Sequence, residues 1–441
     1  MSKRRRKKVP AEIAIADITH LSHEGRGIAH LSGKATFLFG GLPGENVHFR
    51  YTECKKQYDE GMVTAVANAS PDRVTPKCQH FGVCGGCALQ HLSPSAQRTH
   101  KENVLLEHFQ HQANITPAEV LLPLQGDEWG YRRRARLSVR YVIKKDRVLV
   151  GFRERQSGFV ADIQQCETLH PSIGYKLSAF SDVIMQMDAK RDIAQLEISI
   201  GDNASVFIVR HLAPLPPDDL DRLITFARVH ELHCYLQPGN EDTIHPLYPE
   251  NPDALYYEIP AENLRLYFQP SQFTQINQKI NLQMIARAID LLDCQKTDRV
   301  LDLFCGMGNF SLPIAKHVKE VLGVEGSEKA ILQAKSNAEK NNIVNAQFFT
   351  HDLTKDCVDT AWGNLTFDKV LLDPARAGAK EILSNMTRWN PSRIVYVSCN
   401  PITLARDTKE LLLLGYRLEK AGVMDMFPHT EHVEAIALFS K

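Results

Sequence analysis

The sequence predicts a multidomain α/β protein in which a small β-barrel, a central α+β domain and a C-terminal Rossmann-like domain follow one another. Five short apolar segments, broken by Gly and Pro, occupy the first 70 residues, as in a small barrel. β-rich stretches mixed with one or two helices follow, to about residue 258. From Glu262 onward, strand and helix patterns alternate, which is typical of a parallel sheet with crossover helices. The predicted domains are therefore 1–72, 73–260 and 261–441.

The composition is that of a globular chain. Of 441 residues, 43% are hydrophobic and 24% are charged, which excludes a disordered, fibrous or membrane-spanning protein. No apolar run approaches the roughly 18 residues of a membrane-spanning helix, and no apolar segment follows the charged start. We therefore expect a cytoplasmic protein without a membrane partner. Its ten cysteines then favour metal binding or chemistry over disulfides.

Charge is balanced overall but unevenly distributed. The chain has 52 basic and 52 acidic residues, yet Lys3 to Lys8 is an unbroken basic run. Residues 131–155 hold ten basic and two acidic side chains, a net charge of +8. Such density suits phosphate contacts with a nucleic acid. The alternative is a solvated strand face and a basic tail without a partner.

The individual elements are predicted from short apolar runs and their turn signals. A Ser-Pro-Ser cap opens a helix over 95–114, and four prolines make 237–253 a loop. The barrel strands are predicted at 12–18, 27–30, 35–39, 45–51 and 61–67, and the central strands at 135–142, 148–152, 196–200 and 205–210. The C-terminal strands are predicted at 299–304, 320–325, 346–351, 367–372 and 393–399, with a final strand at 435–439.

The first C-terminal strand leads into a glycine loop, Phe304-Cys-Gly-Met-Gly-Asn309. Glu325 follows Gly306 by 19 residues at the end of the next strand, and Asp352 follows the third. This arrangement holds a nucleotide ribose by its hydroxyls. The loop lacks a third glycine and a Lys-Ser/Thr pair, which disfavours a dinucleotide or ATP. It resembles the first motif of S-adenosylmethionine-dependent methyltransferases, whose ligand carries no phosphate. A turn without a ligand would leave both carboxylates unexplained.

A cysteine and a glutamate are the candidate catalytic groups. Cys399 ends a strand just before a proline-started helix, where the helix N-terminus favours a thiolate. Its polar neighbours Ser398 and Asn400 favour a nucleophile over an inert core cysteine. Glu434 enters an apolar strand, where burial would raise its pKa toward that of a useful base. The alternative for Glu434 is a solvated strand end.

These groups together fit methylation of a carbon that is not nucleophilic by itself. Thiolate addition to C6 of a pyrimidine makes C5 able to attack a sulfonium methyl group, and a base then removes the C5 proton. Methylation of a nitrogen would need neither Cys399 nor Glu434. His429 and His432, in the same segment as Glu434, indicate a hydrogen-bonded turn rather than a metal site.

Three motifs resemble the signatures of the RNA uracil-C5 methyltransferase family: Asp373-Pro-Ala-Arg-x-Gly, Ser398-Cys-Asn-Pro and the stretch from Asp425 to Glu434. The resemblance implies that Cys399 is the nucleophile and Glu434 the general base. It also implies that Arg376 stabilises an enolate or contacts a phosphate, without choosing between these roles. The positions implied to hold S-adenosylmethionine are Gln275, Phe304, Asn309, Glu325, Asp352 and Asp373.

Four cysteines form a candidate metal site. Cys78, Cys84 and Cys87 lie in one glycine-rich loop, and Cys166 follows later. Four thiolates suit either tetrahedral zinc or an iron–sulfur cluster. The spacing lacks the paired Cys-x-x-Cys of a zinc ribbon and differs from the Cys-x3-Cys-x2-Cys of radical enzymes. Resemblance to the ribosomal branch of the family, which carries a 4Fe-4S cluster on this spacing, implies that cluster here, with a structural or RNA-positioning role. The other cysteines show no ligand spacing.

The N-terminal barrel resembles the TRAM RNA-binding domain, an OB-like barrel, in the segments 23–29 and 42–47. With the cluster loop, this resemblance implies the family branch that methylates uracil 1939 of 23S ribosomal RNA, and we expect a monomer. The target uridine is expected to be flipped out of its stack or single-stranded. The alternatives are the same chemistry on a tRNA or another ribosomal uridine, and a non-catalytic RNA-binding iron–sulfur protein with a vestigial α/β domain. Cys399, Glu434 and the intact glycine loop argue against the last.

Overall fold

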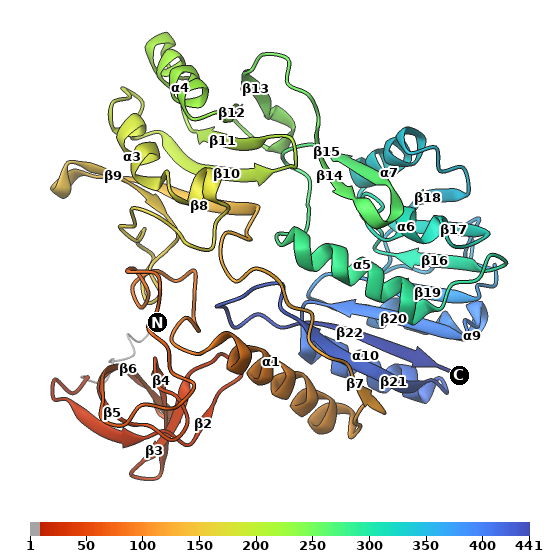
Figure 1. Cartoon of the computed structure of the whole chain (residues 1–441), viewed down its shortest axis with the longest axis horizontal. Helices are drawn as coiled ribbons and strands as arrows, with labels where there is room; N and C mark the ends of the chain where they lie inside the picture. Colours follow the sequence, from red (N-terminus) through yellow and green to blue (C-terminus); the bar gives the residue numbers. More distant parts are fainter. Residues whose placement is uncertain (1–8) are drawn as a thin grey trace, which may run out of the picture. The chain divides into compact units, whose positions relative to one another are not determined.

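The computed structural model describes residues 9–441, so the basic run Lys3–Lys8 lies outside the described residues. The chain forms two compact units (Figure 1). Unit 1 comprises the chain up to Val104 together with Phe427–His432, and unit 2 comprises Leu105–Met426 and Val433–Lys441. These units are defined by compactness alone, so the three-domain division of the sequence stays a prediction.

Unit 1 begins with a six-stranded sheet in the order β1-β5-β6-β4-β3-β2, coloured red to orange in Figure 1. Alternate residues of its strands point inward, as in a small barrel, and form a core of Ala16, Ile18, Ala29, Leu38, Val47 and Phe49. Gly61 lies where a Cβ would come within 2.7 Å of the Phe49 ring. The strands are β1 Ala14–Asp17, β2 His20–Leu21, β3 Gly27–Leu31, β4 Lys34–Phe39, β5 Asn46–Cys54 and β6 Tyr58–Val66.

The predicted helix after the cysteine loop is present. Helix α1 spans Pro94–His108 and continues as a π-helical turn, Phe109–Ala113, which ends at Asn114 in the left-handed conformation. Ser93 caps its start, because its hydroxyl accepts a hydrogen bond from the amide of Ala96 at 3.4 Å.

Unit 2 contains a central six-stranded sheet, ordered β13-β12-β11-β10-β8-β9. The prediction of a loop over 237–253 is wrong for the middle of that range. Edge strand β13 forms there and pairs antiparallel with β12. Pro246 fits β13 because an edge strand tolerates the missing amide proton. The strands are β8 Arg134–Val142, β9 Arg147–Gly151, β10 Ile193–Ile200, β11 Ser205–His211, β12 His233–Gln237 and β13 His245–Tyr248, and the helices are α2 Pro171–Gly174, α3 Leu177–Met185 and α4 Pro217–Val229.

A hairpin and a helix lead from the central sheet to the last one. Strands β14 Leu255–Ile259 and β15 Leu264–Phe268 pair antiparallel around Asn263, and helix α5 spans Gln278–Leu292. Asn277 caps α5, since its side chain accepts a hydrogen bond from the amide of Ile280. The hairpin lies where the sequence pattern had indicated the start of a parallel sheet.

The last sheet has eight strands in the order β18-β17-β16-β19-β20-β22-β21-β7. Its first five strands are parallel, as predicted, but β22 is antiparallel to both of its neighbours, β20 and β21, so the sheet is mixed. The strands are β7 Glu119–Val120, β16 Arg299–Leu303, β17 Glu320–Glu325, β18 Ala346–Thr350, β19 Lys369–Leu372, β20 Arg393–Ser398, β21 Arg417–Met424 and β22 Glu434–Ser440. The helices are α6 Ser311–Ala315, α7 Glu328–Lys340, α8 Lys380–Leu383, α9 Met386–Trp389 and α10 Pro401–Leu413.

Helix α5 packs against β19, β20 and β22, and α10 packs against β21 and β22 (Figure 1). The central strands are apolar on both faces and almost fully buried, as in a doubly wound sheet. In residues 9–441 no helix has the length and apolarity needed to span a bilayer.

Candidate active site

The glycine loop follows β16 directly and bends sharply over the sheet. Phe304 has a φ of 64°, and Gly308 has a φ of 94°. A Cβ at Gly308 would lie 3.0 Å from the Leu312 side chain, so only glycine fits there without displacing α6. Glu325, at the end of β17, fixes the mouth of the loop by accepting hydrogen bonds from the amides of Gly306 at 3.3 Å and Ser327 at 2.9 Å.

Three carboxyl groups meet beneath this loop. Burial, with the negative charges of Asp373 and Glu325, raises the pKa of Asp302, within β16, to about 7, although hydrogen bonds from Ser311 act in the opposite direction. Burial and Glu325 likewise raise the pKa of Asp373, just after β19, to about 7. Ser311 donates a hydrogen bond to one oxygen of Asp302, while the other is buried without a hydrogen-bond partner. A buried acidic cluster with an unsatisfied oxygen suits a cationic ligand, as the sulfonium and ammonium groups of S-adenosylmethionine would provide.

Asn309 is held by two residues that the sequence analysis did not single out. It exchanges side-chain hydrogen bonds with Asn281 of α5, at 2.9 and 3.0 Å, and its oxygen also accepts from the Tyr257 hydroxyl at 2.7 Å. Asn281 is a buried polar residue in the first turn of an amphipathic helix. That position was the one signal in the sequence that could have indicated it.

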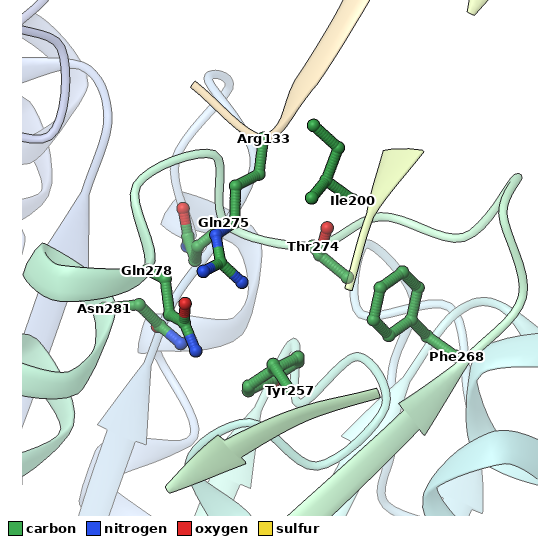
Figure 2. A pocket seen from close by; sticks show the side chains of 8 residues that line it. All are labelled: Arg133, Ile200, Tyr257, Phe268, Thr274, Gln275, Gln278 and Asn281. Carbon is green, nitrogen blue, oxygen red and sulfur yellow. The ribbon is translucent and has the colours of Figure 1, made fainter. Parts of the chain in front are cut away.

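Gln275 lies in a small pocket, open to solvent, that is formed by residues of the central sheet, the hairpin, α5 and the segment before it (Figure 2). The pocket combines amide and guanidinium groups with aromatic and aliphatic walls. It is lined by Arg133, Ile200, Tyr257, Phe268, Thr274, Gln275, Gln278 and Asn281. The structure therefore places Gln275 near Asn281, the partner of Asn309.

Asp352 has a different environment from the buried carboxyls. It follows β18 and is half exposed, and hydrogen bonds from the Thr354 hydroxyl and amide lower its pKa. Its carboxylate therefore accepts hydrogen bonds within its own turn, whereas the charge of Glu325 contributes to the raised pKa values of both Asp302 and Asp373.

The two candidate catalytic residues lie next to each other across a strand pair. Ser398 of β20 is paired with Ala435 of β22, so Cys399 and Glu434 occupy the next position of the ladder. Cys399 is partly buried, and Glu434 is 8% exposed. The two residues are 35 positions apart in the chain, and no sequence pattern predicted that they would be neighbours. The antiparallel insertion of β22 supplies that reason.

The surroundings of Cys399 raise the pKa of its thiol, which is the direction opposite to that expected from the helix N-terminus alone. Burial raises its pKa to about 11, and the negative charges of Glu434 and Asp373 contribute. Arg376 acts in the opposite direction. These electrostatic effects locate Glu434, Asp373 and Arg376 around one sulfur atom, at the carboxyl ends of β19 and β20.

The loop that carries Arg376 is fixed by a buried carboxylate. Asp407 of α10 accepts hydrogen bonds from the amide of Ala379 and the hydroxyl of Tyr396, both at 2.7 Å. The side chain of Asn400 donates to the carbonyl of Arg376 at 3.0 Å and caps α10. Asp407 is a further residue that the sequence analysis missed, because a polar residue at one turn of a helix carries no distinctive pattern.

Half of the ten basic residues of the segment 131–155 bind other parts of the fold, namely Arg133, Arg134, Arg136, Lys145 and Arg147. The half-buried guanidinium of Arg134 donates to three successive carbonyls, those of Pro270, Ser271 and Gln272, which precede the exposed Phe273. Other ion pairs join Arg133 to Asp202, Arg136 to Glu197, and Lys145 and Arg147 to Asp162. The net charge of +8 is thus reduced by nearby acidic residues that lie outside the segment in sequence.

The candidate cluster ligands are divided between the two units. Cys78, Cys84 and Cys87 belong to unit 1 and Cys166 to unit 2. The amide of Gly86 donates to the Cys84 sulfur at 3.4 Å, and the Cys166 sulfur lies 3.3 Å from the Thr168 hydroxyl. Among residues 9–441, no three His, Cys, Asp or Glu side chains are arranged to hold a metal ion.

The fold and the carboxyl-end site define an S-adenosylmethionine-dependent methyltransferase with an N-terminal RNA-binding barrel. The TRAM domain matches residues 12–64, and the tRNA (Uracil-5-)-methyltransferase family matches residues 256–441. The chain is 47% identical over 439 residues to the 23S rRNA (uracil(1939)-C(5))-methyltransferase RlmD of Alcanivorax borkumensis, covering 99% of each chain. It is 48% identical to the RlmD of Xanthomonas campestris pv. campestris, covering 100% of this chain and 99% of that one.

Among solved structures, the tRNA (uracil-54, C5)-methyltransferase of Pyrococcus abyssi, in complex with S-adenosyl-L-homocysteine, shares the fold. It has a TM-score of 0.73 at 24% identity and covers 96% of this chain and 99% of that one. The chain belongs to the family of S-adenosylmethionine-dependent RNA uracil-C5 methyltransferases.

Proposed function

We propose that this enzyme methylates C5 of a uridine in 23S ribosomal RNA, the position numbered 1939 in its relatives. Full-length identity to RlmD proteins of two organisms supports the substrate. The observation that carries the mechanism is the pairing of Ser398 with Ala435, which makes Cys399 and Glu434 neighbours. The same proposal implies a cytoplasmic enzyme, because ribosomal RNA is its substrate.

Cys399 loses its proton and adds to C6 of the uracil, which makes C5 nucleophilic. S-adenosylmethionine supplies the methyl group as a sulfonium. The positive charge of Arg376 lowers the pKa of the Cys399 thiol and so favours the thiolate. From the same position, Arg376 is suited to stabilise the negative oxygen of the enolate. Glu434 then takes the C5 proton as the C6–sulfur bond breaks and the C5–C6 double bond returns.

We assign the methyl donor to Gln275, Phe304, Asn309, Glu325, Asp352 and Asp373. The buried carboxyls and the unsatisfied oxygen of Asp302 support a cationic donor there. Glu325, at the mouth of the glycine loop, is suited to the ribose hydroxyls. The uridine must leave its stack to reach Cys399, so we expect a flipped base.

The test uses 23S rRNA transcripts labelled with tritium at C5 of uracil. The enzyme with S-adenosylmethionine is expected to release one tritium per methyl group transferred, and Cys399→Ala is expected to release none. Tritium release by Cys399→Ala at the wild-type rate would disprove covalent catalysis. A tRNA methylated faster than the ribosomal transcript would overturn the proposed substrate.

We also propose that Cys78, Cys84, Cys87 and Cys166 hold a 4Fe-4S cluster, on the basis of their spacing and of family resemblance. Anaerobically purified protein is expected to be brown, because such clusters absorb visible light, and to contain four irons per chain. Colourless protein containing stoichiometric zinc would contradict this assignment.

A further inference from the structure

The segment Phe427–His432, which connects β21 to β22, belongs to unit 1 rather than to the unit that contains both strands. Gln97 of α1 binds His429 twice. Its side-chain oxygen accepts from the His429 amide at 2.8 Å, and its nitrogen lies 3.2 Å from the His429 Nδ1. The carbonyl of His429 accepts from the amides of Ala88 and Leu89 at 2.8 and 3.0 Å. One turn further along α1, the Lys101 ammonium donates to the carbonyl of Phe427 at 2.9 Å.

The side chains that make these contacts are buried, and the backbone of His429, which they hold, is in an unfavourable conformation. Gln97 and Lys101 are each 1% exposed, and burying such groups is unfavourable unless they are hydrogen-bonded. His429 has a φ of 67°, a conformation that is unfavourable for a non-glycine residue and persists only where neighbouring contacts enforce it. Gln97 also donates to the carbonyls of Leu89 and Leu92, and these hydrogen bonds orient its side-chain amide toward His429.

The held segment ends at His432, two residues before Glu434. We propose that Gln97 and Lys101 are positioning residues for Glu434: by fixing Phe427–His432, they fix the point at which β22 begins and hence the carboxylate. Proton transfer is sensitive to such placement, since a displacement of about 1 Å can cost on the order of 100-fold in rate. The inference rests on the proposed role of Glu434 as the base.

The reaction separates this role from a general contribution to folding. Methyl transfer precedes the step that uses Glu434, and it leaves the RNA bonded to Cys399 through C6. Glu434 then accepts the C5 proton, the C5–H electron pair forms the C5–C6 double bond, and the C6–sulfur bond breaks to release the thiolate. A misplaced Glu434 therefore delays only the last step, and methylated RNA accumulates while still attached to the protein.

The experiment compares Gln97→Met and Lys101→Met with Asn103→Met in the full-length enzyme, since Asn103 is exposed on the same helix. Single-turnover methyl transfer to labelled RNA and the SDS-resistant protein–RNA adduct are both measured over time. Glu434→Gln provides the reference for a missing base. Both test variants are expected to transfer methyl within about threefold of wild type, to lose turnover at least tenfold, and to accumulate adduct, whereas Asn103→Met behaves like wild type.

Loss of turnover without adduct would overturn the inference, as would wild-type turnover in both variants. If a Gln97 variant does not fold, Lys101→Met decides the matter alone, because it removes the hydrogen bond to the Phe427 carbonyl and leaves the Gln97 contacts in place. Absence of adduct in Glu434→Gln would instead disprove the base assignment, and this inference would fall with it. Adduct in Glu434→Gln but in neither helix variant would leave the proposed function intact and refute only the positioning role.

Discussion

Cys399 leaves β20 directly beside Glu434, the first residue of β22, because Ser398 and Ala435 form the last pair between these two strands. The negative charge of Glu434 contributes to the raised pKa of the Cys399 thiol, which reaches about 11. The same proximity that suits Glu434 for the final proton transfer therefore opposes early ionisation of the nucleophile. A raised thiol pKa means that ionisation of Cys399 requires a compensating positive charge, and Arg376 lowers the pKa in that sense.

Alkylation of Cys399 checks this relationship. With iodoacetamide, wild-type Cys399 is expected to react slowly at pH 7 and faster as the pH rises toward 11, because only the thiolate reacts. Glu434→Gln is expected to accelerate the reaction at a given pH several-fold, since it removes a charge that raises the thiol pKa. Peptide mass spectrometry resolves Cys399 from the other nine cysteines. A slower reaction in Glu434→Gln would contradict the assigned electrostatics.

The acidic cluster predicts how stability depends on pH. Asp302 and Asp373 have folded-state pKa values near 7, above their unfolded values near 4, so the folded state binds more protons between these values. The contribution of this cluster to the free energy of unfolding is thus fully present below about pH 4 and is lost as the pH rises through about 7. Asp302→Asn is expected to flatten the decline of the melting temperature between pH 5 and 8.

The same linkage predicts the pH dependence of donor binding. Because a cation favours ionised carboxyls, S-adenosylmethionine is expected to bind more tightly at pH 8 than at pH 6, by up to about tenfold for each proton released on binding and each pH unit crossed. Calorimetry in buffers of different ionisation enthalpy measures that proton release. Binding that is independent of pH, without proton release, would show that the cluster does not face the donor.

Arg134 and Arg136 separate a role in the fold from a role in RNA affinity. Both lie on β8, but Arg134 binds three carbonyls ahead of Phe273 and Gln275, whereas Arg136 is 65% exposed. Arg134→Gln is expected to lower turnover about tenfold and to weaken binding of S-adenosylmethionine, because the loop of Gln275 loses its support. Arg136→Gln removes an equal charge and is expected to change only RNA affinity and its salt dependence. Equal effects of the two substitutions on turnover would refute this distinction.

Tyr396 donates a hydrogen bond to Asp407, the carboxylate that also binds the Ala379 amide of the Arg376 loop. Tyr396→Phe removes a buried bond to a charged acceptor and is expected to cost about 1.5–3 kcal/mol in stability. Urea denaturation measures the change, and Tyr416→Phe, which loses a buried bond to the Pro391 carbonyl, serves as the control for a neutral acceptor. The loss in Tyr396→Phe should be the larger of the two.

Local signals in the sequence predicted much of the α/β domain. Strands β16 to β20 were visible as short apolar runs, and Glu325 and Asp373 were recognisable because they follow such runs. Asp302 was hidden inside a strand, where only its burial reveals an unusual pKa. The position of β22 could not be predicted, because strand order depends on pairing between distant segments. Strand β13 was missed because its proline resembles that of a loop.

The order of the strands in the last sheet has a consequence for how the enzyme is made. Strand β22 lies between β20 and β21 yet follows both in the chain. During synthesis, the donor loops and Cys399 emerge from the ribosome before Glu434 does, and the gap in the sheet is filled last. Until β22 joins the sheet, the proposed nucleophile therefore lacks its proposed base. The insertion of β22 both joins β20 to β21 by hydrogen bonds and brings Glu434 beside Cys399.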